Sequence, residues 1–383
     1  MEMACNTRIV RTRSADPWWN LAVEEYLLEQ ALQGETILYL WQNDNAVLIG
    51  RNQNPWRECR TDLLESDGGK LARRLPGGGA VYQDLGNLNF SFITGSGAYD
   101  PDKQLEAVQE AVKSLGIAAE KSEGSGLTAN GRKFTESAFC FRKGNSCHHG
   151  TMYISTDIDK LSRYLQTASG NMTSKSVDPV GPRIVNLSEL KPGLDIETMA
   201  DILIEAFRKV YSSTAQVENC LRKCSESRAA LEELYCKYSS WTWRYGKAAE
   251  LDTSIETKFP WGGLEVAFRL ENGIVSDAAV YSDAMDADYI QGLSALLKGC
   301  KFSSECLAGR IGEAPVTDRV STVTAPDGIS AVATPDRVST VTAPDRISTV
   351  TAPDGICAAV IPDSTQTCVM TADIVKWLRD MDF

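Results

Sequence analysis

Three glycines follow two arginines in residues 73–87, which read RRLPGGGAVYQDLGN. Glycine lacks a Cβ and readily adopts positive φ, so successive glycine N–H groups can line one concavity. Arginine adds charge-assisted donors that suit a carboxylate or a phosphate. The segment therefore indicates an anion-binding loop built from Gly77, Gly78 and Gly79 together with Arg74. A tight hairpin that needs flexible residues is the alternative interpretation.

The spacing of these glycines matches neither of two common phosphate-binding motifs. A P-loop has the pattern G-x-x-x-x-G-K-[ST], and a dinucleotide-binding turn has G-x-G-x-x-G between a strand and a helix. After the glycines, residues 80–92 are β-branched, aromatic and small, and apolar residues alternate with polar ones near the end. This is strand periodicity. We predict that the loop joins two strands rather than opening a helix.

Two further clusters contain residues suited to the same chemistry. Lys133 follows a Gly-Arg turn and precedes a run of β-formers, so its ammonium is placed to meet an anion held by the glycine loop. A lone lysine is more often a solvated charge. Residues 147–154, CHHGTMYI, contain the two histidines of the chain, His148 and His149. Neighbours on a strand face opposite ways, so these histidines and Cys147 are a poor zinc set, and no metal ligands are predicted.

The three clusters, in this order, resemble the lipoate–protein ligase family. Its members typically show Arg-Arg-x-Ser-Gly-Gly-Gly-Ala-Val-x-His-Asp-x-Gly-Asn, then Gly-Arg/Lys-Lys-x-Ser-Gly-Ser/Asn-Ala, then His-His-Gly-Thr. Residues 16–28 resemble the opening helix of the family, and residues 49–54 resemble its second strand and loop. Residues 241–247 and 259–263 resemble the joint to a small C-terminal domain. The likeness extends over residues 7–310 and the last dozen.

This resemblance implies an enzyme that activates lipoate with MgATP to lipoyl-AMP and passes the lipoyl group to a lysine of an acceptor protein. The acceptors would be lipoyl domains of 2-oxoacid dehydrogenase E2 subunits or the glycine cleavage H protein. Lys133 would be catalytic, stabilising charge on the acyl oxygen and the phosphate. The expected substrate and nucleotide contacts are Arg74, Gly77, Gly78, Gly79, Ala80, Asp84, Asn87, His149 and Thr151. Turn capping is an equal alternative for Asp84 and Asn87, and His148 is expected to pack.

The sequence departs from the family pattern at several positions near the expected site, including Ser125-Gly126 in place of the usual Asn-Asp. Pro76 replaces a serine, so a hydroxyl and an N–H are both missing. Gln83 replaces a histidine, which keeps a donor but removes a titrating group. Glu136 replaces a glycine, and its carboxylate would repel an acyl phosphate unless it turned outward or paired with Arg132 or Arg142.

Two other functions remain open at this point. A related octanoyl- or lipoyl-transferase would use a cysteine thioester without ATP, and Cys140 and Cys147 lie near the site in sequence. Neither cysteine stands where those relatives place their nucleophile. A non-catalytic binder of lipoate or adenylate is the other alternative, motivated by Pro76, Gln83 and Glu136.

Composition favours a two-domain cytoplasmic enzyme. The chain has 383 residues, a formal net charge of −12 and 11 cysteines. The charge argues against nucleic acid as a partner, and an odd number of scattered cysteines favours reduced thiols. From the residue pattern we expect neither a signal peptide nor a membrane-spanning segment. An acidic acceptor could be steered only by a local basic patch. Its candidates are Arg51, Arg57, Arg60, Lys70, Arg73 and Arg74.

The predicted fold class is α+β, with a large mixed-sheet domain of the biotin/lipoate-ligase type and a small α/β C-terminal domain. We assign residues 1–247 to the catalytic, lipoate- and ATP-binding domain and residues 248–383 to the accessory domain. Expected helices are 18–32, 102–115, 157–166, 195–211, 218–236 and 286–297. Strands are expected within 251–270 and over 274–281. Residues 175–182 are predicted to form a loop, either an ordinary connection or a cover for the site.

A nine-residue repeat beginning at Asp318 follows, typified by DRVSTVTAP. Each unit contains a proline, which has no backbone N–H to donate to a neighbouring strand, and each unit has few apolar residues to bury. We therefore expect residues 318–371 to be a mobile insertion in the small domain, in front of a closing helix that starts at 372. A binding module is the less favoured interpretation. Closure entropy grows slowly with loop length, so the domain can tolerate the insertion.

Overall fold

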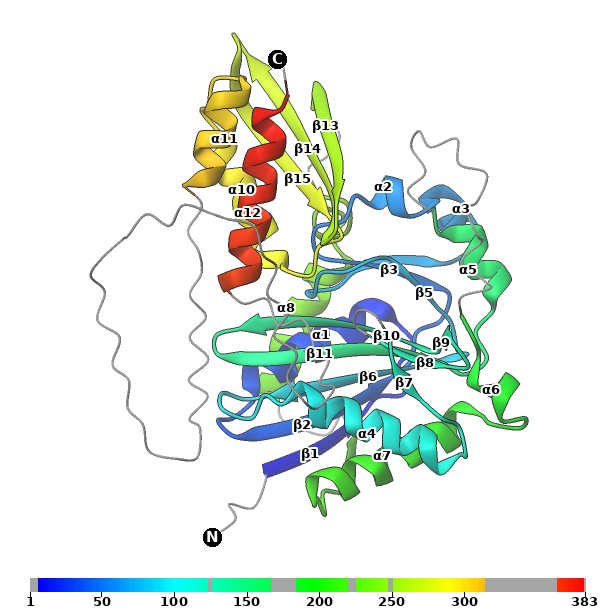
Figure 1. Ribbon diagram of the computed structural model, residues 1–383. Coiled ribbons are helices and arrows are strands. Elements are labelled where there is room, and N and C mark those ends of the chain that lie inside the picture. The colour runs from blue at the N-terminus through cyan, green and yellow to red at the C-terminus, as the bar shows by residue number, and fades with distance from the viewer. Residues whose placement is uncertain are drawn as a thin grey trace.

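The computed structural model describes residues 6–122, 126–166, 184–219, 225–246, 251–313 and 364–381. Its larger part is built on a six-stranded mixed sheet in the order β10-β11-β6-β2-β1-β12 (Figure 1). These strands are β1 (Asn6–Arg11), β2 (Glu35–Trp41), β6 (Asn87–Thr94), β10 (Thr135–Arg142), β11 (Asn145–Tyr153) and β12 (Val217–Asn219). Strand β1 pairs in parallel with β2 and β12, and the other neighbours are antiparallel.

Two smaller sheets accompany the large one. The first has the order β4-β3-β5 and consists of β3 (Ala46–Ile49), β4 (Lys70–Arg73) and β5 (Val81–Gln83). The second has the order β7-β8-β9 and consists of β7 (Glu120–Lys121), β8 (Leu127–Ala129) and β9 (Arg132–Lys133).

Helices pack around these three sheets, and some of them cover the two faces of the large one. They are α1 (Pro17–Gln30), α2 (Pro55–Glu58), α3 (Thr61–Ser66), α4 (Pro101–Ser114), α5 (Ile158–Tyr164), α6 (Leu187–Leu190), α7 (Ile196–Tyr211), α8 (Ser225–Ser239) and α9 (Trp241–Tyr245). Helices α4 and α7 pack on one face, where Phe90 and Phe92 of β6 meet Val108 and Phe207 (Figure 1). The other face is covered by α1 and the β4-β3-β5 sheet, so two layers of strands lie on this side.

Strand β6 shows how the sequence produces these layers. Its alternate residues Leu88, Phe90 and Phe92 belong to the apolar core beneath α4 and α7. The residues between them, Asn89 and Ser91, are fully buried on the opposite face. Side chains alternate along a strand, and buried polar groups need partners. The predicted alternation is therefore confirmed, and it places a polar surface between the two sheets.

The predicted helix starts follow from aspartate caps. Asp16, Asp100, Asp157 and Asp195 each accept a hydrogen bond from a backbone N–H in the first turn of the following helix. Such caps satisfy donors that a helix leaves unpaired at its start. The expected helices at 18–32, 102–115, 157–166 and 195–211 are accordingly confirmed, with small differences at their ends.

The second part of the chain has its own sheet and apolar core. It comprises β13 (Thr253–Phe259), β14 (Gly262–Glu271), β15 (Ile274–Ser282), α10 (Ala287–Leu297), α11 (Ser304–Gly312) and α12 (Ser364–Arg379). The three antiparallel strands pack on α10, α11 and α12, with Phe268, Leu293 and Ile374 in the shared core. The α+β class and the presence of a smaller C-terminal domain agree with the sequence analysis.

Two element predictions were wrong at their boundaries. Residues 217–219 form strand β12, because Val217 pairs with Ile9 at the sheet edge, and the helix starts only at Ser225. Helix α12 starts at Ser364, so residues 364–371 are helical rather than part of a mobile insertion. Thr367 explains this, since its hydroxyl donates to Asp286 while Met370 is buried. The remaining repeats and the loop at 175–182 lie outside the described residues. Among the described helices, none combines the length and apolarity needed to cross a bilayer.

Candidate functional site

The glycine loop connects β4 to β5, which flank β3 on its two sides. This confirms that the loop joins two strands. Gly78 has φ of +84°, a conformation that favours glycine. A Cβ on Gly50 would lie 2.1 Å from the carbonyl oxygen of Gly78. The backbone after β3 therefore packs directly against the loop and leaves no space for a side chain at Gly50.

Arg74 holds this loop from inside. Its Nη2 donates to the carbonyl oxygens of Gly77 and Gly79, at 2.7 Å each, and its Nη1 donates to Leu48 at 3.1 Å. Burial lowers the pKa of Arg74 to about 10. Its Nε is buried and has no hydrogen-bond partner within the described chain. Arg74 was predicted to hold an anion, but its three hydrogen bonds go to backbone carbonyls of β3 and the glycine loop, and its Nε is left without a partner.

Residues of the C-terminal part cover two of the three glycines. The Gly78 N–H donates to the carbonyl oxygen of Ala284 at 3.4 Å. A Cβ on Gly77 would lie only 2.3 Å from the same oxygen, whereas a Cβ on Gly79 would meet nothing within 4 Å. The loop between β15 and α10 thus sits on Gly77 and Gly78. Gly79 remains open to the space beneath.

Strand register builds the opposite wall of that space. Directly paired residues of antiparallel strands point to the same face of a sheet. One row across the large sheet contains Glu136, Thr151, Asn89 and Trp41, and the next contains Ala138, His149, Ser91 and Tyr39. Polar side chains from β10, β11 and β6 therefore gather beneath the glycine loop.

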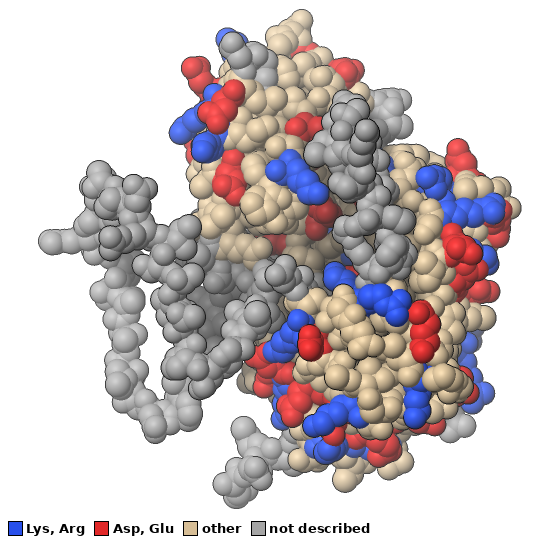
Figure 2. Space-filling view, turned by 45° about the vertical axis from the view of Figure 1, so that its right-hand side comes forward, with Lys and Arg blue, Asp and Glu red and all other residues tan. Residues whose placement is uncertain are grey.

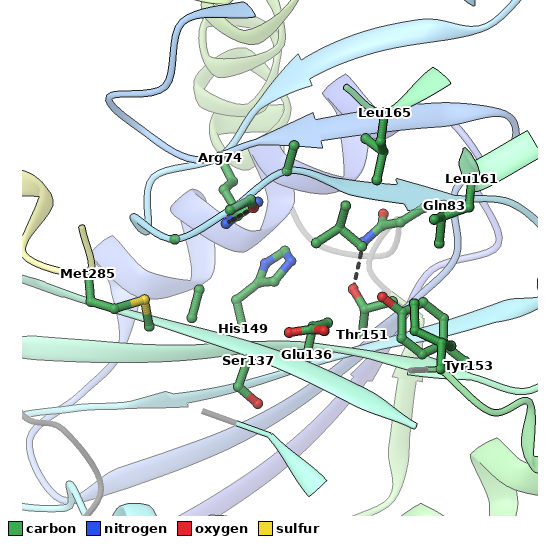
Figure 3. A pocket seen from close by; sticks show the side chains of 16 residues that line it. Arg74, Gln83, Glu136, Ser137, His149, Thr151, Tyr153, Leu161, Leu165 and Met285 are labelled. Carbon is green, nitrogen blue, oxygen red and sulfur yellow. Dashed lines mark hydrogen bonds between the residues drawn. The ribbon is translucent and has the colours of Figure 1, made fainter. Parts of the chain in front are cut away.

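A cavity of about 260 Å³ lies between the loop and these rows (Figure 3). Its lining comprises Arg74, Gly78, Gly79, Ala80, Val81, Gln83, Glu136, Ser137, Ala138, His149, Thr151, Tyr153, Leu161, Leu165, Ile184 and Met285. The structure thus brings together six of the predicted site residues, namely Arg74, Gly78, Gly79, Ala80, His149 and Thr151. The other four, Gly77, Asp84, Asn87 and Lys133, lie outside the lining.

His149 is held by a buried carboxylate. Its Nδ1 lies 2.9 Å from Oε1 of Glu24, which also accepts from the Ser91 hydroxyl at 2.5 Å. Burial acts to raise the pKa of Glu24, but attraction to His149 and donors from His149, Ser91 and Cys147 outweigh it, so the pKa is lowered. Beside an ionised carboxylate, Nδ1 carries the proton, and Nε2 is the nitrogen left for another partner.

Gln83 and Thr151 belong to a second buried network. The Gln83 side-chain amide donates to Thr151 at 2.7 Å and to Asn89 at 2.8 Å, and its oxygen accepts from Asn43 at 2.7 Å. Thr151 donates in turn to Asn89 at 2.8 Å. Gln83, where the family has histidine, is therefore used to fix the pocket floor, and it also lines the pocket.

Asp84 and Asn87 shape the turn after β5. Asp84 accepts from the backbone N–H groups of Gly86 and Asp157 at 2.8 and 2.9 Å, and Asn87 accepts from the N–H of Asp84 at 2.8 Å. Burial raises the pKa of Asp84, although the hydrogen bonds from these two N–H groups act to lower it. Turn capping accounts for the Asp84 carboxylate and for the side-chain oxygen of Asn87, and nucleotide contact by either residue stays a prediction.

Lys133 stands at the edge of the pocket and faces Glu136. Its Nζ lies 3.6 Å from Oε2 of Glu136, and about a third of each side chain is exposed, 37% and 32%. Neither condition under which Glu136 would avoid repelling an acyl phosphate is met, because its side chain lines the pocket and pairs with Lys133 and not with Arg132 or Arg142. Those arginines pair with other carboxylates instead. Burial raises the pKa of Glu136. The positive charges of Lys133 and, to a smaller extent, Arg74 act to lower this pKa but do not outweigh burial.

His148 packs as predicted. It stacks on Phe139 with ring centroids 4.3 Å apart, and its Nδ1 lies 3.1 Å from the Gln104 side-chain oxygen. Burial lowers the pKa of His148 to about 3, with a further contribution from His149. His148 is therefore neutral and structural.

The two cysteines near the site do not resemble an activated nucleophile. Cys140 and Cys147 are directly paired across β10 and β11, and Cys147 is fully buried. A hydrogen bond with Cys140, burial and the neighbouring Glu24 all raise the pKa of Cys147. A thioester-forming thiol needs an accessible setting that lowers its pKa.

The proposed basic patch is not formed as expected. Arg73 is buried and donates to backbone carbonyl oxygens, including that of Gln53 at 2.7 Å. Arg57 pairs with Glu256 and Glu265. On the face seen in Figure 2, positive and negative side chains are interspersed over the larger part of the molecule. Within the described ranges there is also no cluster of three or more metal-ligating side chains.

Three sets of residues at the pocket were not predicted from the sequence to belong to the site. Glu24 and its neighbour Glu25 are acidic residues within the mainly apolar stretch of α1, and that mismatch was a usable signal. Tyr153 and Leu161 follow the His-His-Gly strand and enter through β11 and α5. Met285 comes from the C-terminal part, and no local pattern indicates that it meets the glycine loop.

The fold and pocket define an α+β protein with a cavity between a glycine loop and a mixed sheet. A family model for the lipoyl protein ligase A/B catalytic domain matches residues 16–208, and one for the bacterial lipoate protein ligase C-terminus matches residues 248–330. The chain belongs to the lipoate–protein ligase family, and it is a ligase. The resemblance of the three motifs is thereby confirmed.

Solved structures agree with this assignment. LipL1 of P. falciparum, crystallised in complex with lipoate, is 27% identical with a TM-score of 0.69, and the match covers 80% of this chain and 94% of that one. A bipartite lipoate protein ligase from Thermoplasma acidophilum, described with its E2 lipoyl domain, is 26% identical with a TM-score of 0.57, covering 65% and 99%. Lipoate-protein ligase A bound with ATP is 27% identical with a TM-score of 0.56, covering 63% and 99%.

Proposed function

We propose that this chain attaches lipoate to an acceptor protein in two ATP-dependent steps, through lipoyl-AMP. The observation that carries the proposal is the pocket beneath Gly79, walled by His149, Thr151 and Arg74. The Nε of Arg74 is buried behind this wall and has no hydrogen-bond partner among the described residues. A buried donor without a protein acceptor is suited to an anionic guest. The relatives crystallised with lipoate and with ATP support both substrates.

In the first step, a lipoate carboxylate oxygen attacks the α-phosphorus of ATP. A bond forms between the carboxylate oxygen and the α-phosphorus, which gives lipoyl-AMP. The bond between the α-phosphorus and the oxygen that bridges to the β-phosphate breaks, and pyrophosphate leaves. Both reactants are anions, and their repulsion must be overcome. Lys133, at the pocket edge, supplies the positive charge that stabilises the acyl and phosphoryl oxygens as the bond forms.

In the second step, the neutral ε-amine of an acceptor lysine attacks the acyl carbon. An amide bond forms, the bond to the phosphate oxygen breaks, AMP leaves, and the amine loses its proton. His149 is placed by Glu24 with Nε2 available to a pocket ligand, so it is suited to accept a hydrogen bond from a hydroxyl of the adenylate. The acceptors we propose are E2 lipoyl domains and the glycine cleavage H protein. The E2 lipoyl domain of the Thermoplasma system supports the first of these.

Magnesium fits this site only as part of the substrate. In the described residues, carboxylates do not gather into a metal-ligating group, and Glu24 is already engaged by His149. Mg²⁺ is commonly held by nucleotide phosphates with few protein ligands. We therefore assign it to the MgATP complex, and the protein residues act on the phosphates.

The cysteine-thioester transferase is disfavoured by the burial of Cys147 and the rise of its pKa. Lipoate-dependent exchange of pyrophosphate into ATP separates the three functions. A ligase shows exchange without any acceptor present, and it then lipoylates a purified lipoyl domain. Absence of exchange, with transfer from an acylated carrier, would identify a transferase. Binding of lipoate without either reaction would identify a non-catalytic binder.

A further inference from the structure

Glu136 places a negative charge inside the pocket that is proposed to bind two anions. Its side chain lines the cavity from β10, below Arg74 and beside Thr151 (Figure 3). Its direct partner in the described residues is Lys133, with Nζ and Oε2 separated by 3.6 Å. The lysine proposed to serve the reaction is therefore already paired with a carboxylate of the protein.

The strand register keeps Glu136 in this position. Glu136 is paired with Thr151, and alternation along β10 puts it on the same face as Ala138, which is paired with His149. A side chain at this position of the strand therefore projects under the glycine loop and not to the opposite face. A one-residue shift would be needed to remove it, and that would displace the whole row.

No other cation competes for Glu136 from the flanking residues. Arg132 pairs with Glu189 at 3.3 Å, and Arg142 pairs with Glu25 at 2.8 Å. Around the pocket, the charged or titratable groups on the facing elements are Arg74 after β4, Lys133 on β9, His149 and Tyr153 on β11, and Glu24 on α1. Arg74 is held mainly by loop carbonyls, so Lys133 is the cation whose position Glu136 can determine.

We propose that Glu136 is an internal counter-anion that holds Lys133 at the edge of the pocket and competes with the substrate carboxylate for it. The inference rests on the proposed function and concerns affinity. A bound carboxylate must draw Lys133 away from Glu136 and also withstand repulsion from it. Glu136 is in this view a specificity-determining residue that weakens anion binding, and it takes no part in bond formation.

Protonation of Glu136 follows from the same geometry. Burial already raises its pKa in the empty protein, and an anion nearby raises it further. Binding of lipoate should therefore take up protons, and affinity should rise as the pH falls toward the raised pKa. Lipoamide, the neutral amide of lipoate, lacks the carboxylate and should show neither effect.

The test compares Glu136→Gln with Glu189→Gln in the full-length protein. Glu189 is a matched control because it pairs with Arg132, next to Lys133, but does not line the pocket. Calorimetric titration should give about three- to tenfold tighter lipoate binding for Glu136→Gln, the order expected for one partly screened charge, with proton uptake abolished. Lipoamide affinity and the Glu189→Gln protein should stay within about twofold of wild type. Unchanged or weaker lipoate binding, or an equal gain for lipoamide, would overturn the inference.

A second measurement does not depend on lipoate. Trace labelling of amines with acetic anhydride, read by peptide mass spectrometry, should modify Lys133 about three- to tenfold faster in Glu136→Gln than in wild type, because its ion pair is lost. Equal labelling, or slowed transfer to the acceptor in Glu136→Gln, would overturn the inference. If none of the proteins bound lipoate, the proposed function would fail instead, while the labelling would still report on the ion pair.

Discussion

Glu24 and His149 form a buried pair, with Oε1 and Nδ1 2.9 Å apart, at the floor of the pocket. Ser91 donates to the same carboxylate oxygen, and Trp41 donates to Ser91 at 3.2 Å. Trp41 also packs edge-on against the His149 ring, with centroids 5.2 Å apart. Three elements, α1, β2 and β6, therefore fix the orientation of one imidazole on β11.

Replacement of Glu24 by Gln should lower kcat/KM for lipoate activation about tenfold, which corresponds to loss of roughly 1.4 kcal/mol from one charge-assisted hydrogen bond. Glu25→Gln is the control, since Glu25 is equally buried but pairs with Arg142 and Lys237 away from the pocket. Both variants should lose stability in urea unfolding, and only Glu24→Gln should lose activity beyond that. Equal kinetic effects would show that Glu24 acts only through stability.

The buried His148 gives a testable pH dependence. Its pKa is about 3 when folded, against an ordinary value of 6.5, so the unfolded chain binds the proton first as the pH falls. Its contribution to stability is complete above about pH 6.5 and declines between that pH and about 3. Between pH 8 and pH 5, this residue should account for a loss of about 2 kcal/mol in the free energy of unfolding.

His148→Phe should remove that part of the pH dependence. The loss of the Gln104 hydrogen bond adds a cost that does not vary with pH, so the comparison rests on the slope and not on absolute stability. Urea unfolding of both proteins at pH 8 and pH 5 measures the difference. An identical change with pH in wild type and variant would contradict a neutral buried His148.

The glycines of the loop are predicted to differ in their tolerance of a side chain. Gly79→Ala should keep the free energy of unfolding within about 0.5 kcal/mol, because the new Cβ meets nothing within 4 Å, yet it should weaken substrate binding about tenfold by entering the pocket. Gly50→Ala should instead destabilise the fold by about 1–3 kcal/mol, because its Cβ would lie 2.1 Å from the Gly78 oxygen. Denaturant unfolding and lipoate titration of both variants check this. Strong destabilisation by Gly79→Ala would refute the open position of Gly79.

The prediction from the sequence succeeded where a requirement is local. The helices that follow aspartate caps, the alternation in β6 and the strand–loop–strand form of the glycine segment are all set by neighbours in the chain. Arg74, Gly79 and His149, named from the family motifs, line one cavity, because the spacing of a motif fixes which residues share a loop or strand. Their roles in binding stay predictions.

The partners of those side chains were not predictable in the same way. Which acceptors Arg74 uses depends on how the loop folds back upon it, and the Lys133–Glu136 pair depends on the approach of β9 to β10. Met285 reaches the pocket only because the C-terminal part docks on Gly77 and Gly78. Contacts of this kind arise from tertiary packing, which local periodicity does not encode.

The cysteine pair should be dispensable. The Cys140→Ser, Cys147→Ser double variant keeps a donor toward Glu24 and small side chains at both positions, so exchange activity should stay within about threefold of wild type. A variant that folds, as judged by circular dichroism and thermal unfolding, but has lost activity would favour the thioester route.

Lys133 is the residue on which the proposed chemistry depends most directly. The decisive measurement is lipoate-dependent pyrophosphate exchange by Lys133→Ala, compared with Lys143→Ala, a mostly exposed lysine paired with Glu29. Loss of one electrostatic donor at a developing charge predicts a fall of about 10²–10³ for Lys133→Ala and little change for Lys143→Ala. Exchange by Lys133→Ala within about threefold of wild type would contradict the role assigned to this lysine.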